Sequence, residues 1–445
     1  MYEDTIAAIS TPVGQGGIGI VRLSGRDARL IAERLFDRRL TDRRLVYGHI
    51  IDPSNGEVVD EVLTSYMEAP HTYTREDIVE INCHGGPQPL QRILDLALAS
   101  GARMAEPGEF TLRAFLNGRI DLAQAESVLD IVQAKTAASL RVAVQGLGGG
   151  LSQAIRAVRG ELMSVLSYLT ARIDFPEDDI EEQETAPLVR RALARVEELI
   201  SSAGAGMVYR QGVRTAIVGR RNVGKSSLLN RLLRQSRAIV SPVAGTTRDT
   251  VEEVVNLRGV PFVLVDTAGI VKSKDLVESL GVERSRGAIE QADFVLLVLD
   301  ASTPLEATDE EIIGLLCGKE VLVVANKRDL PCQVRLDHLP WEAVRVSALT
   351  GEGLEELEER MVEAALGGTV YTSDELLVSS SRHSACLERA RAHLEQALAG
   401  IDAPVPDDFV TIDLTGALNA LGEITGETVS DELLETIFAS FCVGK

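Results

Sequence analysis

The segment from Gly219 to Ser226 reads GRRNVGKS, the pattern G-x-x-x-x-G-K-[ST], and it constrains the fold more than any other part of the chain. It follows the apolar run 216–218 and precedes a helical pattern at 227–233. Glycines let the backbone curl so that N–H groups converge at a helix N-terminus, where the helix dipole also favours an anion. We therefore expect a strand, a phosphate-binding loop and a helix, with Lys225 reaching the β and γ phosphates and the Ser226 hydroxyl on Mg²⁺.

Three further motifs follow predicted strands in the same region. Asp266 to Gly269 (DTAG) comes after the strand 262–265, where a carboxylate near Mg²⁺ and an N–H group for the γ-phosphate are required. Asp329 of the NKRD motif can accept from N1–H and the 2-amino group of guanine, which adenine does not offer. Ser347-Ala348, after the strand 343–346, completes the base pocket. The four motifs in this order predict a GTPase. The predicted GTP-binding residues are Asn222, Val223, Gly224, Lys225, Ser226, Ser227, Ser241, Pro242, Val243, Ala244, Gly245, Thr246, Thr247, Asp266, Thr267, Ala268, Gly269, Asn326, Lys327, Asp329, Ser347 and Ala348.

The catalytic side of this predicted site contains one unusual residue. The predicted Mg²⁺ ligands are Ser226 and Thr247, and the neighbouring Thr246 has the simpler alternative of being a turn residue. Ile270 follows DTAG at the position where small GTPases use a Gln to orient water. Because an isoleucine side chain makes no hydrogen bond, another group must position the water, and another positive charge must stabilise the phosphate oxygens.

The order of patterns along the chain predicts several domains. Strands and helices alternate between 213 and 366, which predicts a parallel sheet with crossover helices. Helical spacing dominates 119–210 and returns in 373–400 and 431–441, so we expect the α/β region to be inserted into a helical domain; two separate helical domains are the alternative. The expected fold class is multidomain α/β plus all-α: an N-terminal α/β domain (1–118), the first segment of a helical domain (119–210), an inserted P-loop GTPase domain with a mainly parallel sheet (211–369), and the second segment of the helical domain with the tail FCVGK (370–445).

Composition excludes several classes of protein. Lys and Arg number 45 against 67 Asp and Glu, which gives 45 − 67 = −22, so a free nucleic-acid binder is not expected and contact with nucleic acid must be local or helped by a partner. Apolar runs such as 294–299 are too short to cross a membrane, and no signal peptide is visible. The five scattered cysteines, with no CxxC pair, favour a reducing, cytoplasmic location without disulfides or a zinc site.

Two N-terminal patterns suggest other chemistry and are rejected. Gly14, Gly16 and Gly19 match G-x-G-x-x-G, but they lead into a β-like segment, so a dinucleotide would find no helix N-terminus. Cys83 and His84 are adjacent, and a lone pair of residues does not supply enough ligands for a metal ion. We expect both patterns to have structural roles.

At this point the sequence resembles the MnmE (TrmE) family of bacterial tRNA-modification GTPases over essentially its whole length. The marks of the resemblance are GQGGIGIVRLSG (14–25), EINCHGG (80–86), PGEFTLRAFLNGRIDLAQAE (107–126), IDFPEDDI (173–180), GRRNVGKSSLLN (219–230), AGTTRD (244–249) and FCVGK (441–445). The resemblance implies a homodimer formed through the N-terminal domains, a helical middle domain, and an inserted GTPase domain that dimerises during hydrolysis.

The resemblance also implies roles for individual residues. K⁺ would supply the missing positive charge, and Glu278 would position the attacking water in place of Ile270. Cys442 would be a functional thiol. The implied K⁺ ligands are Asn222, Ser241, Val243 and Thr246, and the implied tetrahydrofolate contacts are Arg22, Glu80, Arg119 and Lys445.

The implied reaction adds a carboxymethylaminomethyl or aminomethyl group to C5 of the wobble uridine (position 34) of certain tRNAs. The one-carbon donor would be a 5-formyl- or methylene-tetrahydrofolate, and FAD would lie on a partner resembling MnmG (GidA), not on this chain, in a heterotetramer or larger complex. A more basic partner would reconcile the charge of −22 with a tRNA substrate. The alternative is a switch GTPase of ribosome assembly, but residues 370–445 show no GxxG loop in a basic setting.

Overall fold

The computed structural model describes residues 4–12, 14–177, 181–236, 253–265, 286–368, 377–403 and 405–444. Its described residues form two compact units, each treated separately below. The first unit contains residues 4–129 and 419–444, and the second contains the described residues between 130 and 418. Helices α4 (Leu122–Gln133) and α14 (Asp407–Thr425) each span a boundary between the units.

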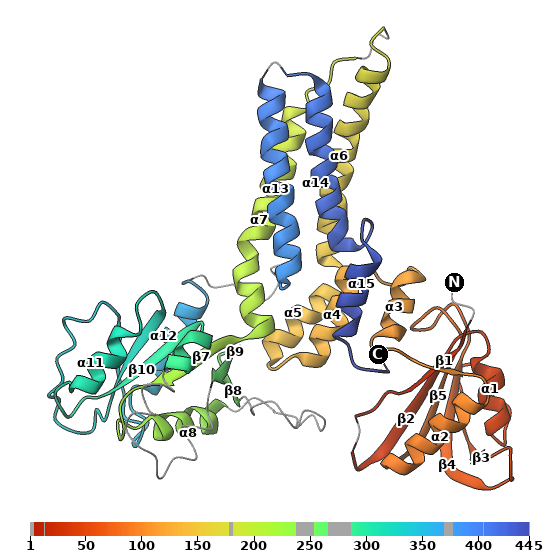
Figure 1. The fold of residues 1–445 in the computed structure, drawn as a ribbon, viewed down its shortest axis with the longest axis horizontal. Coiled ribbons are helices and arrows are strands. Elements are labelled where there is room, and N and C mark those ends of the chain that lie inside the picture. Colours follow the sequence, from red (N-terminus) through yellow and green to blue (C-terminus); the bar gives the residue numbers. More distant parts are fainter. Residues whose placement is uncertain are drawn as a thin grey trace. The chain divides into compact units, whose positions relative to one another are not determined.

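The first unit is built on a six-stranded sheet with the order β3-β4-β5-β2-β1-β6 (Figure 1). Neighbouring strands are antiparallel except for β1 and β6, which are parallel. The strands are β1 (Ile6–Ile9), β2 (Gly16–Ser24), β3 (Leu45–Ile51), β4 (Val58–Met67), β5 (Ile78–Gly85) and β6 (Arg103–Met104). Because Gly16 and Gly19 lie within β2, the rejection of a dinucleotide site agrees with the structure.

Alternation of side chains along the strands gives this sheet two apolar faces. Helices α1 (Ala28–Leu35) and α2 (Pro87–Ala99) cover one face, where Ala7 belongs to the larger core cluster. Its neighbours Ile6 and Ala8 point the other way and join Phe110 of α3 (Glu109–Leu116). This period of two is what a strand buried on both faces requires.

The C-terminal tail packs within the first unit. Phe438 of α15 (Asp431–Ala439) and Phe441 share a core cluster with Leu122. The Gly108 amide donates to the Cys442 carbonyl oxygen at 3.4 Å, and Val443 forms a β-bridge with Pro107. Residues from the two ends of the sequence therefore belong to one fold.

The second unit begins with long helices: α5 (Ala137–Leu147), α6 (Gly150–Asp174) and α7 (Ala186–Gln211). Helix α7 packs against α6 and against α13 (Ser381–Asp402), so helices before and after the α/β elements lie side by side (Figure 1). The predicted apolar stripe of α6 is buried from Ile155 to Leu169, but Ile173, which we expected to belong to it, is exposed near the helix end.

Two helix predictions near the C-terminus need correction. Residues 377–380 are not helical, so α13 begins at Ser381, later than the predicted start at 373. Helix α14 was not predicted at all, because its sequence is rich in Thr and contains Gly416 and Gly422, which weaken a helical pattern. Gly416 instead makes room for the His393 ring, since a Cβ atom there would lie 2.7 Å from it.

A six-stranded sheet forms the α/β part of the second unit, with the order β12-β11-β10-β7-β9-β8. All pairs are parallel except β8 with β9. This confirms the mainly parallel sheet predicted from the sequence. The elements are β7 (Val213–Val218), α8 (Lys225–Ser236), β8 (Glu253–Leu257), β9 (Val260–Val265), β10 (Phe294–Asp300), α11 (Ala307–Gly314), β11 (Glu320–Asn326), β12 (Ala343–Arg345) and α12 (Leu354–Ala365).

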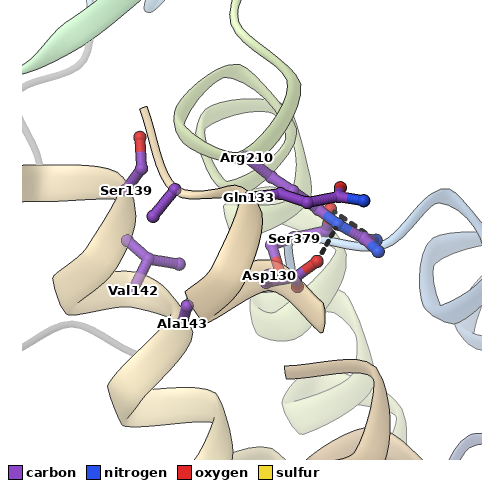
Figure 2. Close-up of a pocket in the computed structure, with 8 residues that line it drawn as sticks. Asp130, Gln133, Ser139, Val142, Ala143, Arg210 and Ser379 are labelled. Atoms are coloured by element: carbon purple, nitrogen blue, oxygen red, sulfur yellow. Dashed lines mark hydrogen bonds and ion pairs between the residues drawn. The ribbon is translucent and has the colours of Figure 1, made fainter. Parts of the chain in front are cut away.

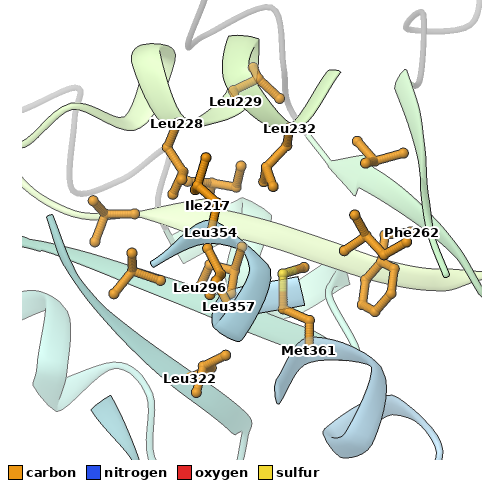
Figure 3. Packing of buried hydrophobic residues seen from close by; sticks show 14 of the residues in the cluster. Ile217, Leu228, Leu229, Leu232, Phe262, Leu296, Leu322, Leu354, Leu357 and Met361 are labelled. Carbon is orange, nitrogen blue, oxygen red and sulfur yellow. The ribbon is translucent and has the colours of Figure 1, made fainter. Parts of the chain in front are cut away.

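Helices cover both faces of this sheet. Leu228 of α8 and Leu357 of α12 meet Leu296 on one face (Figure 3), and Ile312 of α11 packs on the other. A parallel sheet buried on both faces explains why its strands are almost continuous apolar runs. Across the described ranges, no helix is long and apolar enough to span a membrane.

Candidate functional site

The predicted phosphate-binding loop runs from the end of β7 to the start of α8. Three of its residues have positive φ: Gly219 (146°), Asn222 (64°) and Gly224 (100°). A Cβ atom on Gly219 would lie 2.2 Å from the Val298 carbonyl oxygen, and one on Gly224 would lie 2.2 Å from the Asn326 side-chain nitrogen. The loop therefore needs both glycines, because of its backbone angles and because it touches β10 and β11 so closely.

Lys225 begins α8 and directs its ammonium group back into the loop. Its Nζ donates to the carbonyl oxygens of Gly219 at 2.5 Å and Arg220 at 2.6 Å. Burial lowers the pKa of Lys225 to about 8, while Asp309 acts to raise it and Arg221 to lower it further. An incoming phosphate would meet a cation that is already oriented and largely desolvated.

Asn326 connects the phosphate-binding loop to the predicted guanine-binding segments. It ends β11 and is only 2% exposed. Its Nδ2 donates to the Val223 carbonyl oxygen at 2.8 Å, and its Oδ1 accepts from the Ala348 amide at 2.9 Å. One side chain thus fixes the distance between the loop and the Ser347-Ala348 segment through main-chain contacts on both sides.

The predicted guanine-reading carboxylate is held in place. The buried Ser347 hydroxyl donates to Asp329 Oδ1 at 2.5 Å and accepts from the Thr350 amide at 3.1 Å, while Asp329 itself is exposed. Lys327 has a positive φ of 67°, and its Nζ lies 2.5 Å from Asp300 at the end of β10. Burial acts to raise the pKa of Asp300, but the hydrogen bonds from Lys327 and Ser302, together with the Lys327 charge, outweigh it, and the pKa is lowered.

Many of the residues predicted to lie around the γ-phosphate of GTP are outside the described part of the chain. This applies to the segment 241–247 with Thr246 and Thr247, to the DTAG motif 266–269, to Ile270 and to Glu278. The described part fits the expected ions in its donor chemistry. Ser226 places an exposed hydroxyl in the first turn of α8, and the exposed Asn222 offers an amide oxygen, and both are oxygen ligands of the kind that Mg²⁺ and K⁺ take.

In the first unit, the fold brings together Arg22 and Glu80, two of the four residues predicted to contact folate. Arg22 of β2 and Glu80 of β5 are cross-strand partners, with Nη2 and Oε1 2.8 Å apart. Arg22 Nη1 also donates to the Gly444 carbonyl oxygen at 3.3 Å, so the C-terminal tail reaches this pair. Lys445, the next predicted contact, lies outside the described residues.

Aromatic residues that the sequence patterns did not single out lie beside these arginines. The Arg119 guanidinium lies 4.7 Å from the centre of the Tyr73 ring, and that of Arg22 lies 5.7 Å from the centre of the Phe110 ring. Burial raises the pKa of Tyr73, whose hydroxyl is 2.9 Å from Thr111 Oγ1, and both arginines act to lower it. Cationic side chains and aromatic rings therefore lie close together here, an arrangement that suits a flat aromatic ligand. No local sequence motif predicts it.

The cysteines divide into buried and exposed side chains. Cys442 is exposed in the tail, whereas Cys83 is buried in β5. Burial raises the pKa of the Cys83 thiol to about 11. His84 Nδ1 is 2.6 Å from Asp60, and across the described ranges no cluster of three or more His, Cys, Asp or Glu side chains could hold a metal ion. Cys83 is thus buried in the sheet, and His84 contacts Asp60 at the surface.

A small pocket lies elsewhere in the second unit, beside helices α4, α5 and α7 (Figure 2). Arg210 crosses it, donating to Asp130 at 2.7 Å and to the Ser379 carbonyl oxygen at 3.5 Å. Nearby, Ser139 donates to the Tyr209 carbonyl oxygen at 2.6 Å. Arg210 thus links two other groups that line the pocket, and the lining includes no predicted nucleotide-binding residue.

Comparisons with known proteins test the family predicted from the sequence. The protein family described as "GTP-binding protein TrmE N-terminus" matches residues 5–119, and the one described as "MnmE helical domain" matches residues 122–442. The tRNA modification GTPase MnmE of Geobacillus kaustophilus is 50% identical, covering 99% of this chain and 99% of the relative. The protein of the same name from Chloroflexus aurantiacus is 52% identical, covering 100% of both chains.

These matches extend over the whole chain at about 50% identity. The predicted family and fold class are therefore confirmed, and the chain belongs to the MnmE family of tRNA modification GTPases.

Proposed function

We propose that this chain binds GTP between the phosphate-binding loop and the Asp329 segment, hydrolyses it, and uses the hydrolysis cycle in tRNA modification. The observation that carries the proposal is the placement of Asn326, which joins the loop at Val223 to the base segment at Ala348 while Ser347 holds Asp329. A guanine base then meets a fixed carboxylate when its phosphates reach Lys225. The test is hydrolysis by the purified chain: GTP should be consumed and ATP should not, and equal rates would contradict the guanine site.

Metal ions enter this proposal through residues of the loop. Ser226 and Thr247 would hold Mg²⁺, which supplies positive charge to the β and γ phosphates when bound. Asn222, Ser241, Val243 and Thr246 would hold K⁺ when two GTPase domains meet. Hydrolysis should then fall strongly when Na⁺ replaces K⁺, and Asn222→Ala should remove that difference. Equal activity of the unmodified chain in both salts would reject K⁺ activation.

Glu278 would orient the attacking water. Support comes from Ile270, whose side chain has no hydrogen-bonding group for this task. Glu278→Ala should keep GTP affinity, because the carboxylate touches no phosphate, and should lose about a hundredfold or more in turnover. Weaker GTP binding with intact turnover would contradict this role.

The folate component of the proposal rests on the first unit. Arg22, Arg119 and Lys445 would attract the carboxylates of a 5-formyl- or methylene-tetrahydrofolate, and Glu80 would accept from the pterin edge. The pairing of Arg22 with Glu80 and with the Gly444 carbonyl supports it, because these groups meet at one place. Calorimetry should show loss of folate binding in Arg22→Ala and Glu80→Ala with GTP hydrolysis unchanged. Normal folate binding by both variants would contradict the assignment.

The modification step needs the tail and partners. We propose a homodimer that joins an FAD-carrying protein resembling MnmG in a heterotetramer or larger complex, acting on C5 of the wobble uridine of tRNA in the cytoplasm. The charge of −22 supports a basic partner that carries most of the tRNA contact. Cys442→Ser should abolish the modified nucleoside while GTP hydrolysis and melting temperature stay unchanged. Full modification by this variant would end the role of the thiol.

A further inference from the structure

Arg220, the second residue of the phosphate-binding loop, has its side chain fixed on another element. Its Nη2 donates to Thr303 Oγ1 at 2.6 Å, its Nη1 lies 2.8 Å from Glu306 Oε1, and its Nε lies 3.1 Å from Asp309 Oδ2. These three partners belong to the connection between β10 and α11 and to the first turn of α11. The guanidinium thus attaches the loop to the start of α11 by one hydrogen bond and two ion pairs, and its Nε, which makes no hydrogen bond, contributes through charge alone.

This attachment differs from an ordinary surface ion pair. The Arg220 side chain is 16% exposed and that of Asp309 only 3%. Asp309 Oδ2 also accepts from the Glu306 amide at 3.1 Å, in the capping box that starts α11, so the carboxylate cannot move without disturbing the helix. Among the described residues, Asp309 Oδ1 has no hydrogen-bond donor, which leaves the buried carboxylate dependent on nearby cations.

The main chain of the same residue holds the lysine that meets the phosphates. The Arg220 carbonyl oxygen accepts from Lys225 Nζ at 2.6 Å, beside the Gly219 carbonyl at 2.5 Å. Gly219 packs closely against β10, since a Cβ atom there would lie 2.2 Å from the Val298 carbonyl oxygen. The Arg220 side chain is anchored on a different element, and its contacts there restrain the carbonyl oxygen of the same residue.

We propose that Arg220 is a positioning residue of the phosphate-binding loop: anchored on Thr303, Glu306 and Asp309, it holds the carbonyl oxygen that orients the Lys225 ammonium toward the β and γ phosphates of GTP. The inference rests on the proposed GTP site and deepens it. Arg220 acts through Lys225 and touches no phosphate itself. Its loss lets the carbonyl and the ammonium sample other positions, so binding of the phosphates weakens while the guanine contacts stay as they are.

The test compares phosphate binding with base binding in the full-length chain. Arg220→Ala should raise the KM for GTP about ten- to a hundredfold, the range for losing charge-assisted hydrogen bonds, with kcat changed less than about threefold. The affinity for guanosine, measured by competition with a fluorescent guanine nucleotide, should be unchanged, because guanosine has no phosphate. Arg220→Lys keeps the charge on a single donor nitrogen and should recover some of the lost affinity.

A matched control removes an arginine from the surface of the same α/β region. Arg335 is exposed and lies outside the loop, so Arg335→Ala should leave the KM unchanged. An unchanged KM in Arg220→Ala at a normal melting temperature would overturn the inference. So would an equal loss of GTP and guanosine affinity in Arg220→Lys, which would indicate a general folding role. If the unmodified chain bound GTP without hydrolysing it, the proposed function would fail, while the affinity comparison would still test Arg220.

Discussion

The two predicted sites are assembled in different ways. In the second unit, the phosphate cradle is formed by the six residues 219–224 between β7 and α8, through their main-chain groups, together with Lys225 at the start of α8. In the first unit, side chains from the middle of two strands meet: Arg22 and Glu80 are 58 residues apart in sequence, and the Gly444 carbonyl that completes the contact is 422 residues from Arg22. The first kind of site is local in sequence, and the second exists only once the unit has folded.

The two sites should therefore be sensitive to different kinds of substitution. The nucleotide-binding loop depends on glycine conformations and on contacts with the ends of neighbouring strands. The predicted folate site depends on the packing contacts that keep β2, β5 and the tail in place. Substitutions elsewhere in the first unit should therefore weaken folate binding. We therefore expect a substitution that breaks these packing contacts in the first unit to abolish folate binding and to leave GTP hydrolysis intact.

The largest expected effect comes from Arg113, whose side chain is fully buried. It pairs with Asp4 at 2.7 Å, Glu109 at 2.9 Å and Glu76 at 3.2 Å. Arg113→Ala removes the cation that pairs with the buried Glu76 and leaves Glu109 paired with Arg103 alone, so it should cost the first unit about 3–5 kcal/mol of unfolding free energy. Calorimetry should show an early unfolding transition and loss of folate binding, with GTP hydrolysis retained. Arg38→Ala, which removes an exposed ion pair with Asp37, is the control. It should change neither the unfolding transition nor folate binding.

The same network predicts how the first unit responds to acid. Burial acts to raise the pKa of Glu109, but the hydrogen bonds from Arg103, the Glu106 amide and Arg113, together with the Arg113 charge, outweigh it, and the pKa is lowered below its ordinary value of 4.5. A carboxyl group with a lowered folded-state pKa stabilises the fold above its unfolded pKa, and this contribution is lost as the pH falls through the folded pKa. Stability of the first unit should therefore fall below about pH 4.5, and Glu109→Gln should flatten that fall. An unchanged acid transition in the variant would contradict this interpretation.

A smaller and more selective effect is expected from Asp329→Asn. Xanthine has a carbonyl where guanine has its amino group, and an amide can donate to that carbonyl, whereas a carboxylate cannot. The ratio of kcat/KM for GTP to that for xanthosine triphosphate should fall by about a hundredfold. Folate binding in the first unit should be unaffected. An unchanged ratio would remove Asp329 from the base site.

The contrast between the two sites also explains what the sequence could predict. The motif 219–226, the strands around it and the base segment could be predicted because each needs particular residue types at fixed spacing beside an apolar strand. The tethers of Arg220 to Thr303 and of Asn326 to Val223 could not, since they join residues about 80 to 100 positions apart without any pattern. Helix α14 was missed because tertiary packing, which buries residues such as Leu414 and Leu421, outweighs its weak helical pattern.

In the first unit, only the resemblance indicated Arg22, Glu80 and Arg119, because single charged residues in strands and turns carry no signal of their own. Tyr73 and Phe110, which lie against the arginines, were not singled out for the same reason. Sites made by backbone loops can be predicted from a segment, whereas sites made by side chains from distant segments require the fold.

The last and smallest expected effect tests whether the tail lies at an occupied folate site. Exposed Cys442 should be alkylated by iodoacetamide at pH 8, whereas Cys83, whose thiol pKa is raised to about 11 by burial, should react at least about a hundredfold more slowly. Adding 5-formyl-tetrahydrofolate should slow labelling of Cys442 several-fold, because Gly444, two residues away, contacts Arg22. Mass spectrometry of the peptides gives each rate. Exposed Cys317 and Cys332 of the second unit are internal controls and should be unaffected. If folate slowed all three exposed thiols equally, or none of them, the tail would not belong to the folate site. The contrast drawn above, between a nucleotide site formed by one segment and a folate site completed by the C-terminal tail, would then be wrong for the folate site.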